Sequence, residues 1–260
     1  MRKILNLKHK LRKSFSLLLF KFCGNPQKNL ERINSIKNMY RGRRAFIVCN
    51  GPSLRSADLD KIALNGDISI ASNKIDKIFV QTKWRPTLYT ITDEIYQFSL
   101  LSTINRIPAK YKFLRKTSYI KTIKARGNCI FLDTDGDVKY LESPLLVSDI
   151  SGKVPSIATV TYVMFEILLH LGISEIYIIG CDNSYAMEVT KDGKRISNNT
   201  QSYFAGSDNK DMQIAAQTWQ MNIAYDYMRK YADLNGIKVF NATRGGHLEA
   251  FEKIDFDTLF

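Results

Sequence analysis

Two unbroken apolar segments constrain the fold of this chain more than any other feature of its sequence. Ala45–Cys49 is followed by the turn Asn50–Ser53, and Glu175–Ile179 is followed by Gly180-Cys181-Asp182. Both segments have the length of a β-strand, and neither alternates apolar with polar residues. This pattern is typical of strands that are buried on both faces, as in a parallel sheet. We therefore expect an α/β fold with helices on both faces of a mostly parallel sheet.

The turn Asn50–Ser53 is a candidate ligand site, because ligands of open parallel sheets bind beyond the carboxyl ends of the strands. It has one glycine and no lysine, so it is neither a dinucleotide-binding fingerprint nor a P-loop. Gly51 permits a tight bend and a close approach of a ligand, and Pro52 suits the first position of a helix. Asn50 or Ser53 can cap that helix. Two interpretations stay open: an ordinary strand-to-helix connection, and a cradle whose N–H groups bind a phosphate.

The size and the cysteine content indicate one domain with an appendage, in a reducing compartment. The chain has 260 residues, of which 45% are hydrophobic. Cys23, Cys49, Cys129 and Cys181 are scattered, and the histidines are not clustered. This argues against structural zinc and against a disulfide framework, and it fits the cytoplasm. We predict no metal site from these residues.

The positive charge of the chain is concentrated near its N-terminus. Residues 1–44 contain thirteen Lys and Arg and one acidic residue, whereas the rest, with 25 basic and 24 acidic residues, is nearly neutral. Apolar residues recur at helical spacing on one side of this segment: Ile4, Leu7, Leu11, Phe15, Leu18 and Phe22. We interpret residues 1–40 as a basic arm, of which residues 1–22 bind an anionic membrane surface. Residues 41–260 are then the catalytic domain.

The arm has two other interpretations: a helix packed against the body, and a nucleic-acid-binding segment. Its longest apolar stretch, Leu17–Phe20, is far shorter than the roughly 20 residues that span a bilayer. A nucleic-acid enzyme is expected to carry positive charge around its cleft, and the body is nearly neutral. We therefore expect a peripheral protein at the inner face of the membrane, without a nucleic-acid partner.

The rest of the chain predicts alternating strands and helices. Further strands are expected at 67–73, 87–93, 129–132 and 237–240, and helices at 156–171 and 213–234. Polar residues lie at or just past the carboxyl ends of five predicted strands: Asn50, Asn73, Asp93, Asp182 and Asn241. Any one of them fits an ordinary turn. Together they predict one crevice, and the polar segment 186–211 predicts a lid beside it.

The sequence Asp133-x-Asp135 has two interpretations. It can hold a divalent metal against a nucleotide diphosphate, because carboxylate oxygens are hard ligands. It can equally form an acidic turn with Gly136, which we consider the better interpretation.

Three motifs resemble two related families. They are Asn50-Gly-Pro-Ser-Leu54 after a strand, Ile179-Gly-x-Asp182, and Asn241-Ala-Thr-x-Gly-Gly246. One family is the 6-hydroxymethylpterin pyrophosphokinase-like proteins, which include the motility accessory factor glycosyltransferases. The other is the bacterial lipooligosaccharide sialyltransferases. The resemblance covers roughly residues 45–250, lies somewhat closer to the first family, and implies a Rossmann-like fold.

The resemblance also implies a set of site residues. The loop Asn50-Gly51-Pro52-Ser53 would hold the CMP part of a donor, and Asn73 and Asp93 would line the nucleotide-sugar pocket. The further donor-binding positions are Thr159, Thr161, Gly180 and Asp182. Tyr185 or Tyr203 would donate a hydrogen bond to the phosphate.

The sequence departs from the sialyltransferases at the general base. Their lid carries a histidine, and the corresponding position here is Ser207. Candidates for the base are therefore Asp182, His247 and Asp93. His170 lies in an apolar helix and is expected to be a packed core residue.

These observations favour a membrane-surface glycosyltransferase that transfers a nucleotide-activated sugar to a glycan or lipid-linked acceptor, and among such sugars they favour a CMP-activated acidic sugar. The first alternative is a pyrophosphokinase that uses ATP and Mg²⁺, with Asp93, Asp182 and Asp133 or Asp135 as metal ligands. The second is a non-catalytic glycan-binding protein on the membrane. Outside the pyrophosphokinase alternative, no cofactor is expected.

Overall fold

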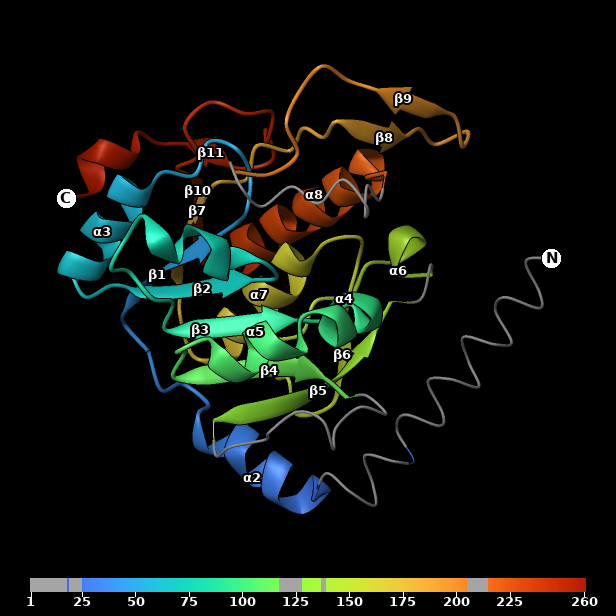
Figure 1. Ribbon diagram of the computed structural model, residues 1–260. Coiled ribbons are helices and arrows are strands. Elements are labelled where there is room, and N and C mark those ends of the chain that lie inside the picture. The colour runs from blue at the N-terminus through green and yellow to red at the C-terminus, as the bar shows by residue number, and fades with distance from the viewer. Residues whose placement is uncertain (1–17, 19–24, 117–127, 137–138, 205–214) are drawn as a thin grey trace.

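The computed structural model describes residue 18 and residues 25–116, 128–136, 139–204 and 215–260. It contains a nine-stranded sheet in the order β11-β10-β7-β1-β2-β3-β4-β5-β6, in which every neighbouring pair is parallel (Figure 1). The strands are β1 Arg44–Val48, β2 Ile68–Ser72, β3 Leu88–Ile91, β4 Tyr111–Arg115, β5 Cys129–Asp135, β6 Lys153–Pro155, β7 Glu175–Ile179, β10 Lys238–Asn241 and β11 Glu252–Lys253. The Rossmann-like α/β fold expected from the sequence is confirmed.

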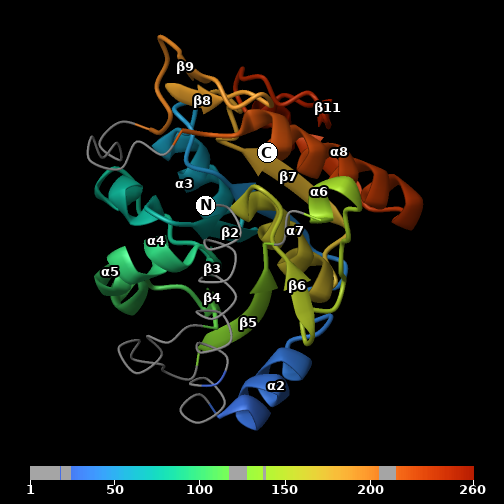
Figure 2. The same ribbon diagram turned by 90° about the vertical axis from the view of Figure 1, so that its right-hand side faces the viewer.

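Helices cover both faces of the sheet, as Figure 2 shows edge-on. One buried cluster joins the sheet to α2 (Pro26–Ser35), α7 (Val160–His170) and α8 (Thr218–Asn235). The other cluster joins it to α3 (Ser56–Leu64), η1 (Ile75–Val80), α5 (Leu101–Arg106) and η3 (Phe256–Leu259). The short helices α4 (Glu94–Ser99) and α6 (Lys139–Glu142) complete the set. Because both faces are covered, the central strands are apolar on both sides, which is why β1 and β7 read as unbroken apolar runs.

The chain order reverses between β1 and β7. Strands β2 to β6 follow on one side of β1, and β10 and β11 follow on the far side of β7. Val48 at the end of β1 pairs with Ile179 at the end of β7. Loops that leave two such strands in opposite directions open a crevice between them, so this is the expected ligand position in an open α/β sheet.

Helix α2 is part of the folded body although it lies within residues 1–40. The Asn29 side chain donates to the Phe131 carbonyl (2.9 Å) and accepts from the Phe131 N–H (2.8 Å), which ties α2 to β5. The buried His170 ring in α7 bonds the Ile33 carbonyl (2.9 Å), so His170 is the packed core residue that was expected. Apart from Leu18, the basic amphipathic segment 1–22 lies outside the described residues. Within the described part of the chain, no helix is both long and apolar enough to cross a membrane.

Several local predictions were wrong. Asp133 and Asp135 do not form a turn, because both lie in β5 and pair with β6. Helix α3 begins at Ser56 with Arg55 as its N-cap, so Pro52 is not at the first helical position and neither Asn50 nor Ser53 caps it. The predicted helix 156–171 begins only at Val160, where the Thr159 side chain caps it.

Strands β4 and β6 and the hairpin of β8 (Met187–Val189) with β9 (Arg195–Ser197) were not predicted. In β4, Lys112 and Arg115 interrupt the apolar pattern. The structure buries Lys112 because its ammonium group donates to the Ile104 carbonyl (2.6 Å).

Candidate functional site

A cavity of about 420 Å³ lies at the carboxyl edge of the sheet, over the ends of β7, β1, β2, β3 and β4. The predicted site residues that line it are Asn50, Gly51, Asn73, Asp93, Thr159, Thr161, Gly180, Asp182, Tyr185 and Tyr203. Pro52, Ser53, Asn241 and His247 are not among its lining residues. The structure therefore brings most of the predicted residues together around one space.

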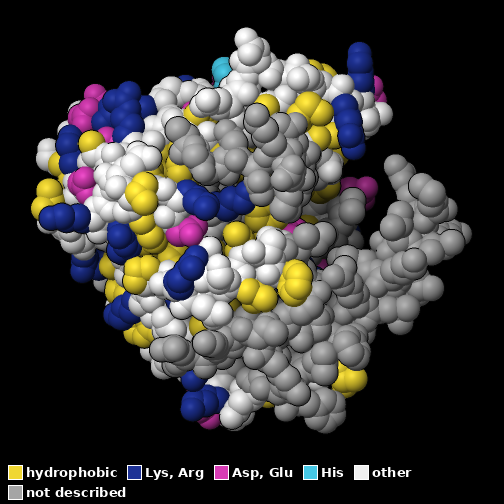
Figure 3. Space-filling view, in the orientation of Figure 1, with side chains coloured by type: hydrophobic (Ala, Val, Ile, Leu, Met, Phe, Trp, Pro, Cys, Tyr) yellow, Lys and Arg dark blue, Asp and Glu magenta, His cyan; other side chains and the backbone are white. Residues whose placement is uncertain are grey.

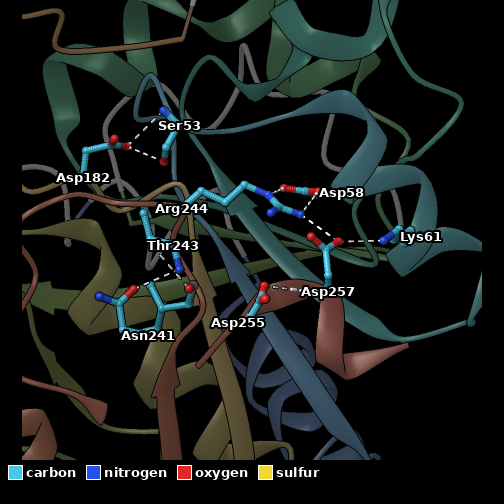
Figure 4. Close-up of polar contacts among 10 residues, drawn as sticks. Ser53, Asp58, Lys61, Asp182, Asn241, Thr243, Arg244, Asp255 and Asp257 are labelled. Carbon is cyan, nitrogen blue, oxygen red and sulfur yellow. Dashed lines mark hydrogen bonds and ion pairs between the residues drawn. The ribbon is translucent and has the colours of Figure 1, made fainter. Parts of the chain in front are cut away.

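The turn after β1 is fixed by the segment after β7. The Gly51 N–H donates to the Gly180 carbonyl (2.8 Å), and the Asp182 Oδ2 accepts from the Ser53 hydroxyl (2.8 Å) and N–H (3.3 Å), as Figure 4 shows for Ser53. A Cβ atom on Gly51 would lie 2.0 Å from Asp182 Oδ2 and 2.6 Å from the Gly180 carbonyl oxygen. The space that a Gly51 side chain would need is thus taken by Asp182, while Gly51 itself lines the cavity.

Asp182 is packed tightly from a second side. A Cβ on Gly246 would lie 2.9 Å from the Asp182 Cα, and the Asp182 carbonyl accepts from the His247 N–H (2.7 Å). Asp182 is buried, with 9% of the residue exposed, whereas His247 is exposed. The Gly-Gly loop therefore positions the Asp182 backbone, and the His247 imidazole lies outside the cavity lining.

Asn241 occupies a strand end but belongs to the core. Its side chain donates to the Leu248 carbonyl (2.7 Å) and accepts from the Thr243 N–H (3.0 Å), and the residue is fully buried. Both ends of the amide are satisfied inside the protein, so Asn241 holds the last loop and has no free group for a ligand.

Three buried polar atoms at the cavity have no hydrogen-bond partner among the described residues. They are Asn50 Oδ1, Ser72 Oγ and Asn183 Oδ1, and all three residues line the cavity. The Asn50 Nδ2 donates to the Ser72 carbonyl (3.2 Å), which directs Oδ1 away from that bond. A buried acceptor without a partner costs roughly 1–3 kcal/mol, so a ligand that supplied N–H or O–H groups here would bind favourably.

Tyrosine hydroxyls supply donors on the β7 side of the cavity. Burial raises the pKa of Tyr185 well above its ordinary value of 10, and burial likewise raises the pKa of Tyr225. Both phenols therefore stay protonated and can donate a hydrogen bond. The Tyr225 hydroxyl contacts the Cys181 thiol (3.4 Å). The Tyr185 side chain forms no hydrogen bond with the described residues, so its hydroxyl can donate to a bound anion.

Two cysteines that are far apart in the sequence meet at the base of the cavity. Both residues line the cavity, and the Cys49 thiol contacts the Thr161 hydroxyl (3.6 Å). The hydrogen bond with Cys181, together with burial, raises the pKa of the Cys49 thiol well above its ordinary value, and the same hydrogen bond lowers the pKa of Cys181. Their separation in the sequence gave no sign of this pair.

Residues with positive φ border the cavity. Asn73 (φ 54°), Ala158 (φ 52°) and Asn183 (φ 53°) all adopt left-handed backbone conformations. Asparagine tolerates this region, but alanine adopts it at a cost of roughly 1–3 kcal/mol. Strained residues of this kind cluster at functional sites, because the surrounding structure must hold them in place.

Arg115 is a cavity residue that the sequence analysis missed, because β4 was not predicted. It is the only Lys or Arg among the described residues that line this cavity. The position of Arg115 in the sequence is the signal that could have revealed it, because Arg115 ends the five-residue strand β4 just as Asp93 follows β3.

The described part of the predicted lid contains the β8–β9 hairpin and a following segment whose Ser202 and Tyr203 line the cavity. The Phe204 N–H donates to the Asn50 carbonyl (3.0 Å), and the Ala186 N–H donates to the Ser202 hydroxyl (3.0 Å). Glu188 accepts from the Asn198 side chain (2.9 Å) and from Thr218 at the start of α8. The segment is therefore tied both to the β1 turn and to α8. The Ser207 and Asp208 positions lie outside the described residues.

Metal binding by the described residues depends on how their carboxylates are grouped. Among them no group of three His, Cys, Asp or Glu lies close enough to hold a metal ion. Asp133 is not a lining residue, and Asp135 lies 3.6 Å from the Lys153 ammonium group. Asp93 and Asp182 follow β3 and β7, which are three strand steps apart, or about 14 Å at 4.8 Å per step.

Comparisons with known proteins agree with this architecture. A sequence model of the family described as 6-hydroxymethylpterin diphosphokinase MptE-like matches residues 21–188, which include the β1 turn and the β7 turn. A comparison with curated protein sequences finds no match. Among solved structures, the MAf glycosyltransferase from Magnetospirillum magneticum AMB-1 is similar, with a TM-score of 0.54 and 16% sequence identity over 90% of this chain. The match covers 39% of that protein, and at this identity the likeness is one of fold.

Proposed function

The chain belongs to the 6-hydroxymethylpterin diphosphokinase MptE-like family, and from that premise we propose that it is a glycosyltransferase that uses a nucleotide-activated sugar. Our finer proposal is a CMP-activated acidic sugar as the donor and a glycan or lipid-linked acceptor. The observation that carries the proposal is the cavity at the β1/β7 reversal, with unsatisfied acceptors from Asn50 and Ser72 and a protonated donor from Tyr185.

The cavity offers the groups that sugar transfer requires. Unpartnered oxygens of Asn50 and Ser72 match the amino and hydroxyl groups of a nucleoside. The Tyr185 hydroxyl can donate to the phosphate oxygen that gains charge as the glycosidic bond breaks. Preorganised donors aimed at developing charge commonly supply the largest part of catalysis.

The general base must be a carboxylate that can still accept a proton from the acceptor hydroxyl. Asp182 and Asp93 line the cavity, and each has one oxygen that accepts no hydrogen bond from the described residues. Oδ2 of Asp182 is bound by Ser53, and Oδ1 of Asp93 accepts from the Tyr96 N–H (2.8 Å). We retain both as candidates. His247 is the weaker one, because its exposed side chain is not part of the lining.

We propose that the basic segment 1–22 holds the enzyme at the inner face of the membrane, where a lipid-linked acceptor is found. Confinement to the surface raises the local concentration of a lipid-linked acceptor. On the described part of the face in Figure 3, Lys and Arg side chains are scattered rather than gathered in one stripe. This distribution supports a small-molecule donor rather than a nucleic-acid partner.

The family description itself favours one second candidate, a diphosphokinase that would use ATP and Mg²⁺. The wide separation of Asp93 and Asp182 argues against it, since Mg²⁺ usually binds one or two neighbouring carboxylates together with substrate phosphates. A non-catalytic glycan-binding protein is the remaining alternative, because function belongs to a site and not to a fold.

The experiment is an assay of donor hydrolysis and of sugar transfer with a CMP-activated acidic sugar, with and without EDTA. We expect turnover that EDTA does not abolish. Tyr185→Phe should lower turnover roughly 10²-fold, the usual loss when one donor to the developing anion is removed. Tyr231→Phe is the matched control, because Tyr231 lies on α8 outside the cavity lining.

The outcomes separate the candidates. Turnover of ATP that requires Mg²⁺ would favour the diphosphokinase. Donor binding without turnover of any nucleotide sugar would favour the non-catalytic protein. Equal turnover in both tyrosine variants would remove Tyr185 from the mechanism.

A further inference from the structure

Arg115 lines the cavity, and the described residues leave its guanidinium group unpaired. Its backbone is clamped by the buried Gln97, which is 1% exposed. The Gln97 Nε2 donates to the Arg115 carbonyl (3.1 Å), and the Arg115 N–H donates to the Gln97 Oε1 (2.9 Å). The clamp fixes where the side chain starts, while its N–H donors form no hydrogen bond or ion pair with the described residues.

Other partly buried arginines of this protein are paired. Arg44 forms two hydrogen bonds with Asp67, both 2.9 Å long, and Arg244 forms two with Asp58, also 2.9 Å each (Figure 4 shows the second pair). In both cases the partly buried guanidinium forms a bidentate pair with a carboxylate. Arg115 differs from them, although it lies beside a space with carboxylates on its walls.

Those carboxylates are already engaged. Asp93 accepts from the Tyr96 N–H and so caps α4, and Asp182 accepts from the Ser53 hydroxyl and N–H. Each acid thus uses an oxygen to hold a backbone turn. Of the described charged residues that line the cavity, Arg115 alone has no such bond and can pair with an anion that enters.

Arg115 lies well away from the β1 turn. Strand β4 is three steps from β1, which corresponds to about 14 Å across the sheet. Tyr185, the proposed donor to the leaving phosphate, lies on the opposite side, after β7. One ligand can therefore place its nucleotide near β1 and β7 while its sugar, with the carboxylate, lies on the Arg115 side of the cavity.

We propose that Arg115 binds a carboxylate on the sugar end of the donor and thereby selects acidic over neutral sugars. A guanidinium and a carboxylate match as two parallel hydrogen bonds, which gives both affinity and orientation. This inference rests on the proposed function for its ligand class. It adds the residue that distinguishes one class of donor from another.

The test uses two ligand comparisons, of which the first isolates the carboxylate and the second isolates the whole acidic sugar, with binding to the full chain measured by calorimetry. UDP-glucuronic acid is compared with UDP-glucose, and CMP-N-acetylneuraminic acid is compared with CMP. The variants are Arg115→Gln and Arg115→Lys, with Arg106→Gln as the control. Arg106 lies on α5, is exposed, and bonds the Ser102 side chain. Melting temperatures verify that each variant is folded, and the Gln97 clamp should survive because it holds only the Arg115 backbone.

Arg115→Gln should weaken the acidic ligands roughly 10- to 100-fold and leave CMP and UDP-glucose within about twofold, as expected for hydrogen bonds to a charged group. Arg115→Lys should restore part of the loss. An equal loss for CMP would place Arg115 on the nucleotide phosphate, and no loss for any ligand would remove it from the site. Either result overturns this inference and leaves the glycosyltransferase proposal standing. Selective loss of acidic ligands in a protein without transferase activity would instead support Arg115 and refute that proposal.

Discussion

Asp182 combines two tasks that are usually separate. Its carboxylate holds the turn after β1 through Ser53, and the residue also lines the cavity. The positions of Asn50, Asn73, Asp93 and Asp182 could be predicted, because polar residues that follow parallel strands share one edge. The hydrogen bonds that hold the Asn241 side chain and the proximity of Cys49 to Cys181 could not be predicted. Each depends on a partner in another loop or strand that a single sequence does not reveal.

The contact between Gly51 and Asp182 predicts that Gly51→Ala destabilises the protein even without a ligand. The new methyl group would lie 2.0 Å from Asp182 Oδ2 and 2.6 Å from a backbone oxygen, and the latter cannot move freely. Overpacking of this kind costs about 1–3 kcal/mol, which should lower the melting temperature by several degrees. Gly152→Ala is the matched control, because a Cβ there meets nothing within 4 Å. Equal melting temperatures for the two variants would refute the proposed packing.

Helix α7 shows what can and cannot be predicted about an element. Its existence follows from an apolar sequence, and its burial between β1, β2, β3 and α8 explains why it is apolar all round. Its delayed start could not be predicted, because it depends on the left-handed Ala158 and on the Thr159 cap. Strand β4 was missed for a related reason: the pattern does not reveal that Lys112 finds a carbonyl inside the fold.

Glu166 in α7 makes the stability of the folded protein depend on pH. It is fully buried, one oxygen accepts from the Val147 N–H (3.1 Å), and the other has no partner among the described residues. Burial raises its pKa well above the ordinary 4.5, so the folded protein keeps a proton that the unfolded chain releases. The stability that the protonated group provides is complete below pH 4.5 and is lost as pH rises toward the folded pKa, by at most about 1.4 kcal/mol per pH unit.

Glu166→Gln removes this titration and keeps an acceptor for Val147. We expect its melting temperature to exceed that of the wild type by a margin that grows between pH 5 and pH 8. Glu142→Gln, on the exposed surface of α6, should show no such trend. Parallel curves for Glu166→Gln and wild type would mean that Glu166 does not titrate as described.

At the scale of the whole molecule, the basic arm can be removed without unfolding the body only if the truncation leaves α2 intact. Asn29 and Ile33 bind this helix to the sheet and to α7, so removal of residues 1–40 would expose the core. The charge pattern revealed the arm, but charge alone could not locate where packing begins.

A truncation of residues 1–24 should therefore leave a folded body that no longer sediments with anionic vesicles. The full chain should bind vesicles that contain phosphatidylserine and should bind phosphatidylcholine vesicles weakly, since the attraction is electrostatic. Circular dichroism and melting temperature verify the fold. If the truncated protein binds anionic vesicles as well as the full chain does, the membrane contact lies elsewhere.

The central claim is that the cavity at the β1/β7 reversal binds a nucleotide, and thermal stabilisation of the full chain tests it most directly. CMP, CDP, UDP, GDP and ATP are compared with and without Mg²⁺, in wild type, Asn50→Ala and the control Asn34→Ala, whose side chain is exposed on α2. A ligand at 100 times its Kd should add about 2.7 kcal/mol of stability. We predict that CMP stabilises wild type and Asn34→Ala without Mg²⁺, and that Asn50→Ala loses most of this response. No stabilisation by any nucleotide, or the same stabilisation in both variants, would contradict the account.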